Sequence, residues 1–256
     1  MMKSWAALGA LTGATMAVAV HAPATWLAGA LATVPGSRVQ LIDARGTLWR
    51  GDGRLMVGDS LGSPDTRALA GRVSWGFGWS DGAPQLALRA DCCMPVVQQV
   101  RLVPGWSLSS ASLSDGSSQW PAAMLSALGA PWNTVQVEGA LRVQTRAVSV
   151  EWSEGRTRLS GQVEVDALGM ASRLSTLRPV GSYRLTLSGG PGPAPPALDL
   201  RTLEGPLRLE GRGEWKGAGW RFTGEASAEP ASESALGNLL NMLGRRQGSK
   251  SILSLG

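Results

Sequence analysis

One serine, Ser60, stands in a Gly-Asp-Ser-Leu tetrapeptide over residues 58–61 that could supply a hydrolytic nucleophile. A serine nucleophile needs a neighbouring base, usually histidine, that accepts its proton. The chain has a single histidine, His21, at the end of an N-terminal apolar segment and far from Ser60 in sequence. We therefore interpret the tetrapeptide as a chance match between two strands, and we expect no catalytic residues.

The carboxylates and the potential metal ligands are not spaced like those of a catalytic or metal-binding site either. An acid–base pair could come from Glu138, Glu151, Glu164 and Asp166, but these residues alternate along expected strands, which is typical of a solvent-facing surface. A structural zinc site usually has four cysteine or histidine ligands. One histidine and two adjacent cysteines cannot provide them without several carboxylates. The sequence thus predicts no metal and no cofactor, and it favours binding over catalysis.

Cys92 and Cys93 are adjacent and are the only cysteines of the chain. In an oxidising compartment they could form a disulfide with each other, pair between chains, or stay reduced in the protein interior. A disulfide between neighbours would define a tight turn before Pro95. The CxxC spacing of redox proteins is absent, so we expect a structural role.

Composition indicates an exported β protein with a mildly basic surface. The 256 residues are 43% hydrophobic and 17% charged, with 34 glycines and 15 prolines, a balance that favours strands and turns. The formal net charge of +5 comes from singly scattered arginines, and only Arg245 and Arg246 form a compact basic patch. Without a basic stripe and interleaved aromatic residues we expect no nucleic-acid partner. Anionic lipid head groups or an acidic protein fit this charge better.

The segment from Ser4 to Val20 is apolar and contains no charge, whereas Lys3 precedes it. This layout predicts a transmembrane helix whose N terminus stays in the cytoplasm. Residues 1–34 would then be the membrane anchor and linker, and residues 35–256 an exported β domain. A cleaved signal peptide is the alternative, because Ala17-Val18-Ala19 resembles a small-x-small cleavage site.

Short alternating segments follow the anchor and predict an all-β domain built on an antiparallel, curved or sandwich-like sheet. Asp52-Gly53, between two such segments, predicts a tight hairpin. The Gly- and Pro-rich residues 189–196 form a loop that could divide the sheet. The expected strands cover residues 39–43, 54–57, 70–79, 85–90, 135–145, 148–152, 158–165, 182–187, 207–215 and 220–226.

Two segments predict short helices. Residues 121–128 begin with proline, which is favoured in the first helical turn. Near the C terminus, Leu236, Leu239, Leu240 and Leu243 follow helical spacing, with Ser232 as a candidate N-cap and Gly244 at the end. A helix of about eleven residues is roughly 16 Å long and too short to cross a bilayer. We expect it to pack on the sheet or to meet a partner.

Eleven tryptophans against two phenylalanines and one tyrosine give the chain an unusual aromatic content. Six of them occupy strand positions that suit a sheet core: Trp49, Trp75, Trp79, Trp152, Trp215 and Trp220. Trp5 and Trp26 suit a membrane interface. Trp106, Trp120 and Trp132 lie in turn-like contexts. Together with Asn133, Arg245 and Arg246 they form our candidate interaction surface.

Several segments, in order, resemble the N protein of bacterial type II secretion systems. They are Gly46-Thr47-Leu48-Trp49-Arg50-Gly51, Ser118-Gln119-Trp120-Pro121, residues 128–134 (LGAPWNT), residues 172–179 (SRLSTLRP), Gly181-Ser182-Tyr183-Arg184 and residues 238–248 (NLLNMLGRRQG). The resemblance runs over nearly the whole chain and transfers no catalytic residue.

This resemblance implies a bitopic inner-membrane protein with a periplasmic domain. Its role would be accessory to the machine that exports folded proteins across the outer membrane. The implied partners are other secretion subunits, either of the inner-membrane platform or the secretin, together with inner-membrane lipid. The chain also looks distantly like AsmA-type proteins, whose curved sheets form apolar grooves for lipid. A periplasmic lipid-binding or lipid-transfer groove is therefore the alternative function.

Overall fold

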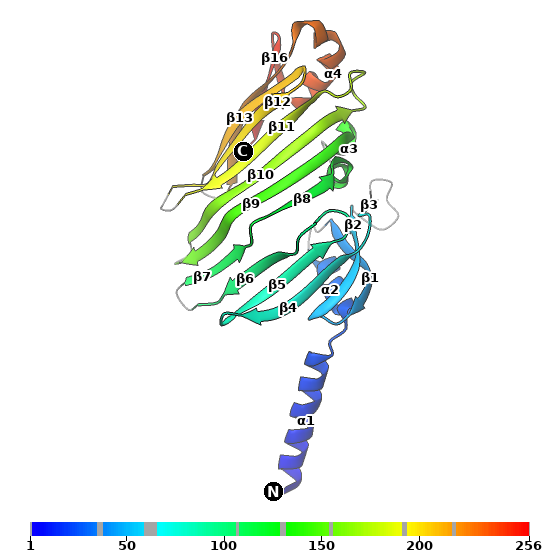
Figure 1. Ribbon diagram of the computed structural model, residues 1–256, viewed down its shortest axis with the longest axis vertical. Coiled ribbons are helices and arrows are strands. Elements are labelled where there is room, and N and C mark those ends of the chain that lie inside the picture. The colour runs from blue at the N-terminus through cyan, green and yellow to red at the C-terminus, as the bar shows by residue number, and fades with distance from the viewer. Residues whose placement is uncertain are drawn as a thin grey trace.

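Most of the chain forms one open antiparallel sheet in a computed structural model (Figure 1). The structure describes residues 2–34, 38–58, 66–105, 108–128, 132–153, 156–190, 194–216 and 219–255. Two residues singled out above, Ser60 and Trp106, lie outside these ranges. Within them the sheet has 16 strands, in the order β1-β2-β4-β5-β6-β7-β9-β10-β11-β12-β13-β14-β16-β15, while β3 pairs with β2 and β8 with β9.

Strands of the N-terminal half are β1 (Val39–Gly46), β2 (Arg50–Val57), β3 (Arg67–Ala68), β4 (Val73–Ser80), β5 (Ala83–Ala90), β6 (Gln98–Val103) and β7 (Leu108–Leu113). Strands of the C-terminal half are β8 (Gly116–Pro121), β9 (Val137–Ser153), β10 (Arg156–Ser172), β11 (Gly181–Gly189), β12 (Ala197–Glu204), β13 (Leu207–Lys216), β14 (Gly219–Ala228), β15 (Arg245–Gln247) and β16 (Lys250–Leu255). Helical segments are α1 (Met2–Val20), α2 (Ala24–Thr33), η1 (Ala122–Leu128), α3 (Trp132–Val135), η2 (Pro230–Ser232) and α4 (Glu233–Leu243).

The predicted antiparallel β architecture is confirmed, and the sheet is open at both edges rather than folded into a sandwich. The Gly- and Pro-rich residues 189–196 connect β11 to β12, which pair with each other in the same sheet. The expected strands do not include β3, β6, β7, β8, β12, β15 and β16. Of these, β7 and β8 are rich in serine and have little apolar alternation, and they are extended because they pair with β9.

The hairpin predicted at Asp52-Gly53 is wrong, because β2 runs straight through these residues. The connection between β1 and β2 lies at residues 47–49 instead. Asp52 is held in the strand by an ion pair with Arg72. A Cβ on Gly53 would lie 2.7 Å from a methyl carbon of Leu41, so this glycine permits a close approach between strands.

A bend crosses the middle of the sheet at β9, which is a single strand where the sequence predicts two. Its first half pairs with β8 and its second half with β7. Between the halves, Ala147 has a positive φ of 48° and donates its N–H to Asp115 Oδ1 at 2.6 Å. On β10, Gly161 has a φ of 86° and leaves no room for a side chain beside the Ala147 carbonyl. The pairing of β9 with β10 shifts register at this point, and bulges of this kind increase the local twist of a sheet.

One face of the sheet carries three apolar clusters in a row. At the C-terminal end, α4 inserts Leu236, Leu239 and Leu240 among sheet residues that include Tyr183 and Met170. Burial raises the pKa of Tyr183, whose hydroxyl donates to the Leu207 carbonyl at 3.2 Å. The two other clusters lie beneath η1 and the Cys92-Cys93 turn, and beneath α2. The helix predicted from the leucine spacing is thus confirmed.

The opposite face carries charged side chains in cross-strand register. Successive partners across β9 to β14 are Arg142, Asp166, Arg184, Arg201, Glu210 and Glu225. Arg142 with Asp166, Asp166 with Arg184, and Arg201 with Glu210 are opposite-charge pairs, which stabilise a sheet, whereas Arg184 with Arg201 and Glu210 with Glu225 are like-charge pairs. The two faces of this sheet are therefore chemically distinct.

α1 extends away from the end of the molecule that carries β1, β2 and α2, and α4 lies at the other end (Figure 1). Side chains from Gly9 to Val20 are exposed. Among the described residues, no helix meets the length and hydropathy needed to cross a bilayer. The predicted transmembrane helix is thus present as a helix, and its membrane crossing is not confirmed.

Candidate functional site

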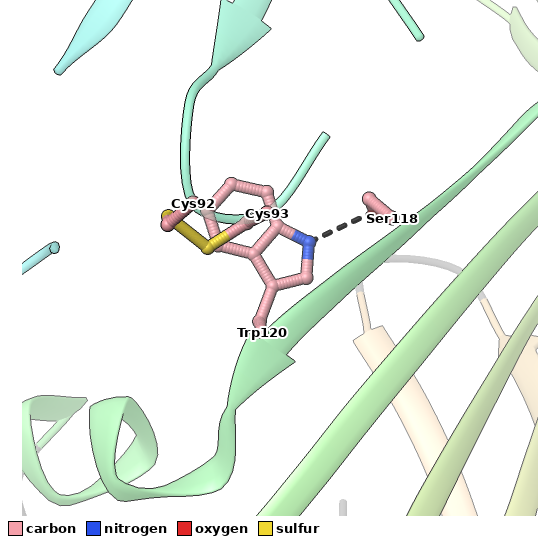
Figure 2. Close-up of a disulfide and its surroundings, with 4 residues drawn as sticks. All are labelled: Cys92, Cys93, Ser118 and Trp120. Atoms are coloured by element: carbon pink, nitrogen blue, oxygen red, sulfur yellow. Dashed lines mark hydrogen bonds between the residues drawn. A yellow bond between two sulfur atoms is a disulfide. The ribbon is translucent and has the colours of Figure 1, made fainter. Parts of the chain in front are cut away.

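Cys92 and Cys93 form a disulfide with each other in the connection between β5 and β6 (Figure 2). Cys92 is exposed and Cys93 is buried among Leu69 and Ala90. The turn is tied to β8 because the Gln119 N–H donates to the Cys93 carbonyl at 2.8 Å. Of the three states that the sequence left open, the structure has the bond between the two neighbours within one turn, and the backbone hydrogen bond from Gln119 connects this turn to β8.

Trp120, on β8, packs against this turn and is half-buried (Figure 2). Its indole N–H donates to Ser118 Oγ at 2.9 Å. Beside the disulfide is a hollow of about 330 Å³, to which Cys92, Gln119 and Arg142 contribute. Trp120 therefore serves mainly as the packing surface of the disulfide, with little of its ring free for a partner.

Trp132 and Asn133 lie on the short helix α3, which follows η1. Trp132 is 41% exposed and Asn133 is half-buried. Val135, at the end of the same helix, is buried in the C-terminal cluster and fixes α3 to the sheet. This arrangement presents the Trp132 ring to solvent from a rigid support, as an interaction surface requires.

Arg245 and Arg246 lie on β15, the last strand in the sheet order. Arg246 is half-buried and forms an ion pair with Glu233 of α4, with 2.9 Å between Nη2 and Oε1. Arg245 is exposed. The predicted basic patch is thus partly neutralised, and it lies on the outermost strand, whereas Trp120 lies on β8 beside the central strand β9. The structure does not gather the predicted residues into one site.

The prediction that six strand tryptophans form the sheet core is wrong for most of them. Only Trp75 is buried, and its indole N–H donates to the Leu48 carbonyl at 3.0 Å. Exposed instead are Trp49, Trp79, Trp152 and Trp215, while Trp220 is half-buried in an edge-to-face contact with Trp215. Trp79, Trp152 and Trp215 each lie one residue before the end of their strand, β4, β9 or β13. The glycine-containing segments that follow them in the sequence are the signal that could have revealed their exposure.

A hollow of about 590 Å³ lies on the sheet over β2, β4 and β5. Gly76 and Gly78 contribute to its floor, and no atom lies within 4 Å of a Cβ built on either glycine. Arg50, Asp52 and Arg89 are among the polar residues around it. The sequence did not predict this hollow. Two glycines on the same face of one strand are the available signal, since successive side chains alternate between faces.

The four carboxylates considered as acid–base candidates each face an arginine. The closest N–O distances are 3.0 Å for Glu138 with Arg178, 3.6 Å for Glu151 with Arg158, 3.3 Å for Glu164 with Arg184 and 2.6 Å for Asp166 with Arg184. Hydrogen bonding by Arg184 holds the pKa of Asp166 below its ordinary value. The same effect of Arg72 lowers the pKa of Asp43. These contacts support a structural role for the carboxylates.

No group of three or more histidine, cysteine, aspartate or glutamate side chains with metal-binding geometry occurs in the described part of the chain. The arrangement as a whole defines an open-sheet protein with one helix-covered face and one charged face. Residues 37–252 match the family model of type II secretion system (T2SS) protein N, and the chain belongs to this family. No curated protein and no solved structure matches the chain. The family links the chain to type II secretion and hence to the bacterial envelope.

Proposed function

We propose that the chain is an accessory component of the type II secretion system that acts by binding other secretion subunits. In this proposal α1 anchors it in the inner membrane as a single-pass protein and the sheet lies in the periplasm. The match to T2SS protein N over residues 37–252, which include all of the sheet except the last three residues of β16, is the observation that carries the proposal.

The surface of α1 supports a membrane anchor. Apart from Lys3, the helix contains no charged residue, and its apolar side chains have no polar face opposite them. A helix that is apolar all round is stable inside a protein core or in lipid. The side chains from Gly9 to Val20 are not covered by the sheet domain, so lipid is the environment that fits them. Lys3 favours a cytoplasmic N terminus.

The disulfide between Cys92 and Cys93 supports a periplasmic location for the sheet. Disulfides form and persist in oxidising compartments, including the bacterial periplasm, and are rare in the cytosol. The bond lies within the β5–β6 connection, whose Cys93 carbonyl accepts a hydrogen bond from the Gln119 N–H of β8. Anchor and disulfide thus agree on a domain that lies outside the cytoplasm.

A protein partner suits the surface better than a lipid groove does. The apolar face of the sheet is occupied by α2, η1, α3 and α4 in the described residues. Among the candidate residues, the Trp132 ring on its short helix is presented to solvent, and the opposite face of the sheet is charged. Exposed tryptophan with a polar rim is typical of protein interfaces.

In vivo photo-cross-linking tests this function with the full-length chain. A photoreactive phenylalanine analogue replaces Trp132, and a matched chain carries it at Met242, an exposed residue of α4. We expect an adduct between position 132 and an inner-membrane platform subunit or the secretin, and a weaker adduct or none at position 242. Absence of any secretion adduct, together with normal export in a deletion strain, would contradict the proposal. Co-purification of phospholipid with the sheet would favour the lipid alternative.

A further inference from the structure

Four aromatic side chains are exposed on elements at the end of the sheet domain next to α1 (Figure 1). Trp26 is 55% exposed, Trp49 45%, Phe77 40% and Trp79 72%. They come from α2, the β1–β2 connection and β4, which are separate along the chain. We call these four residues the aromatic belt.

One residue of the aromatic belt, Trp49, contacts the C-terminal end of α1. The Trp49 indole N–H donates to the Ala19 carbonyl, near the end of that helix, at 2.7 Å. Trp49 also makes an edge-to-face contact with Phe77, with 6.0 Å between ring centroids. Phe77 and Trp79 are two residues apart on β4 and therefore lie on the same face. Trp26 lies in the first turn of α2, three residues after the β-bridge between Pro23 and Thr47.

The same strand shows that these rings are not simply part of the core. Trp75 lies on the same face of β4 as Phe77 and Trp79, and α2 covers it with Ala24 and Leu27. Helix α2 does not extend over Phe77, which is 40% exposed. Two aromatic rings on a continuous strand face therefore lie in solvent, and contiguous apolar surface of this kind marks an interaction site.

The chemistry of the belt and its position identify the partner as a lipid bilayer. Tryptophan rings favour the boundary between lipid head groups and acyl chains, where the apolar ring is buried and the indole N–H stays polar. Trp49 of the belt contacts the end of α1 through the Ala19 carbonyl, and Val18 and Val20 of that helix are exposed beside it in sequence. An apolar phase around α1 therefore reaches the belt at Trp49.

We propose that Trp26, Trp49, Phe77 and Trp79 lie on the phospholipid surface and set the height and tilt of the sheet above the membrane. This inference rests on the proposed function, because it takes α1 as the anchor. It goes further by assigning a second, interfacial contact to the folded domain. A domain held at two points presents its partner-binding surface in a fixed orientation.

Tryptophan quenching by brominated phospholipids tests the belt with the full-length chain. The protein is reconstituted in vesicles of phosphatidylethanolamine and phosphatidylglycerol whose acyl chains are brominated near the head group. Four tryptophans are expected to be quenched, Trp5 of α1 and Trp26, Trp49 and Trp79 of the belt. Trp79→Phe should therefore lower the quenched signal by about a quarter. Trp215→Phe is the matched control, since Trp215 is 40% exposed at the end of β13 in the other half of the sheet. It should leave the quenched signal unchanged.

The outcomes separate the belt from the anchor. Quenching that persists at full strength in Trp79→Phe would remove Trp79 from the belt, and quenching that persists at full strength when Trp26, Trp49 and Trp79 are all replaced by Phe would overturn the belt alone. No quenching in the wild-type protein would overturn both the belt and the anchor. Circular dichroism of each variant confirms that the sheet is intact. A second variant, Trp26→Phe, should reproduce the loss seen with Trp79→Phe, and failure to do so would remove Trp26 from the belt.

Discussion

α4 and α2 both lie on the covered face of the sheet, but they bury different amounts of it. At the C-terminal end α4 places Leu236 and Leu240, both 0% exposed, in a cluster that extends over β9, β10, β11, β13 and β14. At the N-terminal end α2 places Ala24 over Trp75 and leaves Phe77 and Trp79 in solvent. The apolar face of the sheet is thus buried beneath α4 at the C-terminal end, whereas part of this apolar face stays exposed to solvent at the N-terminal end. The predictions below test this difference.

The largest effect is expected from the α4 contact. Leu240→Ala removes a fully buried side chain and leaves a cavity, which should lower the free energy of unfolding by about 2–5 kcal/mol. Met242→Ala, on the exposed side of the same helix, should change it by less than about 0.5 kcal/mol. Urea unfolding of the full-length chain in detergent micelles measures both. Equal effects of the two variants would show that α4 does not bury the apolar face at the C-terminal end of the sheet.

A smaller difference is expected between the ion pairs of the two halves. Arg184 faces Asp166, whose side chain is 4% exposed, whereas Arg72 faces Asp43, whose side chain is 39% exposed. Arg184→Met leaves a buried carboxylate without its donor, and should cost about 1–2 kcal/mol at pH 7. Arg72→Met should cost less, because solvent screens Asp43. Urea unfolding in micelles, repeated at several pH values, measures both.

The pH dependence of the Arg184 effect follows from the direction of the pKa shift. Arg184 lowers the pKa of Asp166 below its ordinary value of 3.8. The pair therefore stabilises the fold above pH 3.8 and loses this contribution as the pH falls through the lowered pKa. The wild-type advantage over Arg184→Met should be complete at pH 7 and shrink in acid. An advantage that grows as the pH is lowered is the contrary result.

The disulfide should matter locally and only in the half of the sheet next to α1. A bond between neighbours closes a very short loop, so the double variant Cys92→Ala/Cys93→Ala should lose only about 1 kcal/mol. Hydrogen exchange measured by mass spectrometry should speed up around β5, β6 and β8, where the turn is attached. Exchange in β11 to β14 should not change. Uniform acceleration across the sheet would mean that the two halves are not independent.

The smallest effect on folding is expected from the belt itself. Trp79 is 72% exposed, so Trp79→Ala should change the free energy of unfolding by less than about 0.5 kcal/mol. Trp75→Ala, four residues earlier on the same strand, should cost about 3–5 kcal/mol because its ring is buried. Urea unfolding in micelles compares the pair. A large cost for Trp79→Ala would place that ring in the core rather than on a contact surface.

Local sequence patterns predicted the elements that carry their own signal. The leucine spacing from Leu236 to Leu243 predicted α4 within a residue at either end. The strands with clear alternation, such as β13 and β14, were also predicted. Ser-rich β7 and β8 were not, because their extension depends on pairing with β9, which lies later in the chain. The same holds for Asp52-Gly53, where pairing across the sheet overrides a turn sequence.

By itself, the sequence determined the antiparallel β class, the terminal helices and the resemblance to T2SS protein N, whereas the open order of the sheet came from the structure. Only the tertiary structure decided which aromatic residues are buried. Trp75 and Trp79 have the same residue type, the same strand and the same face, yet one is 6% and the other 72% exposed. The reason is physical: burial depends on whether a helix from elsewhere in the chain lies over the position. Here α2 lies over Trp75 but not over Phe77, at the end of the sheet domain next to α1.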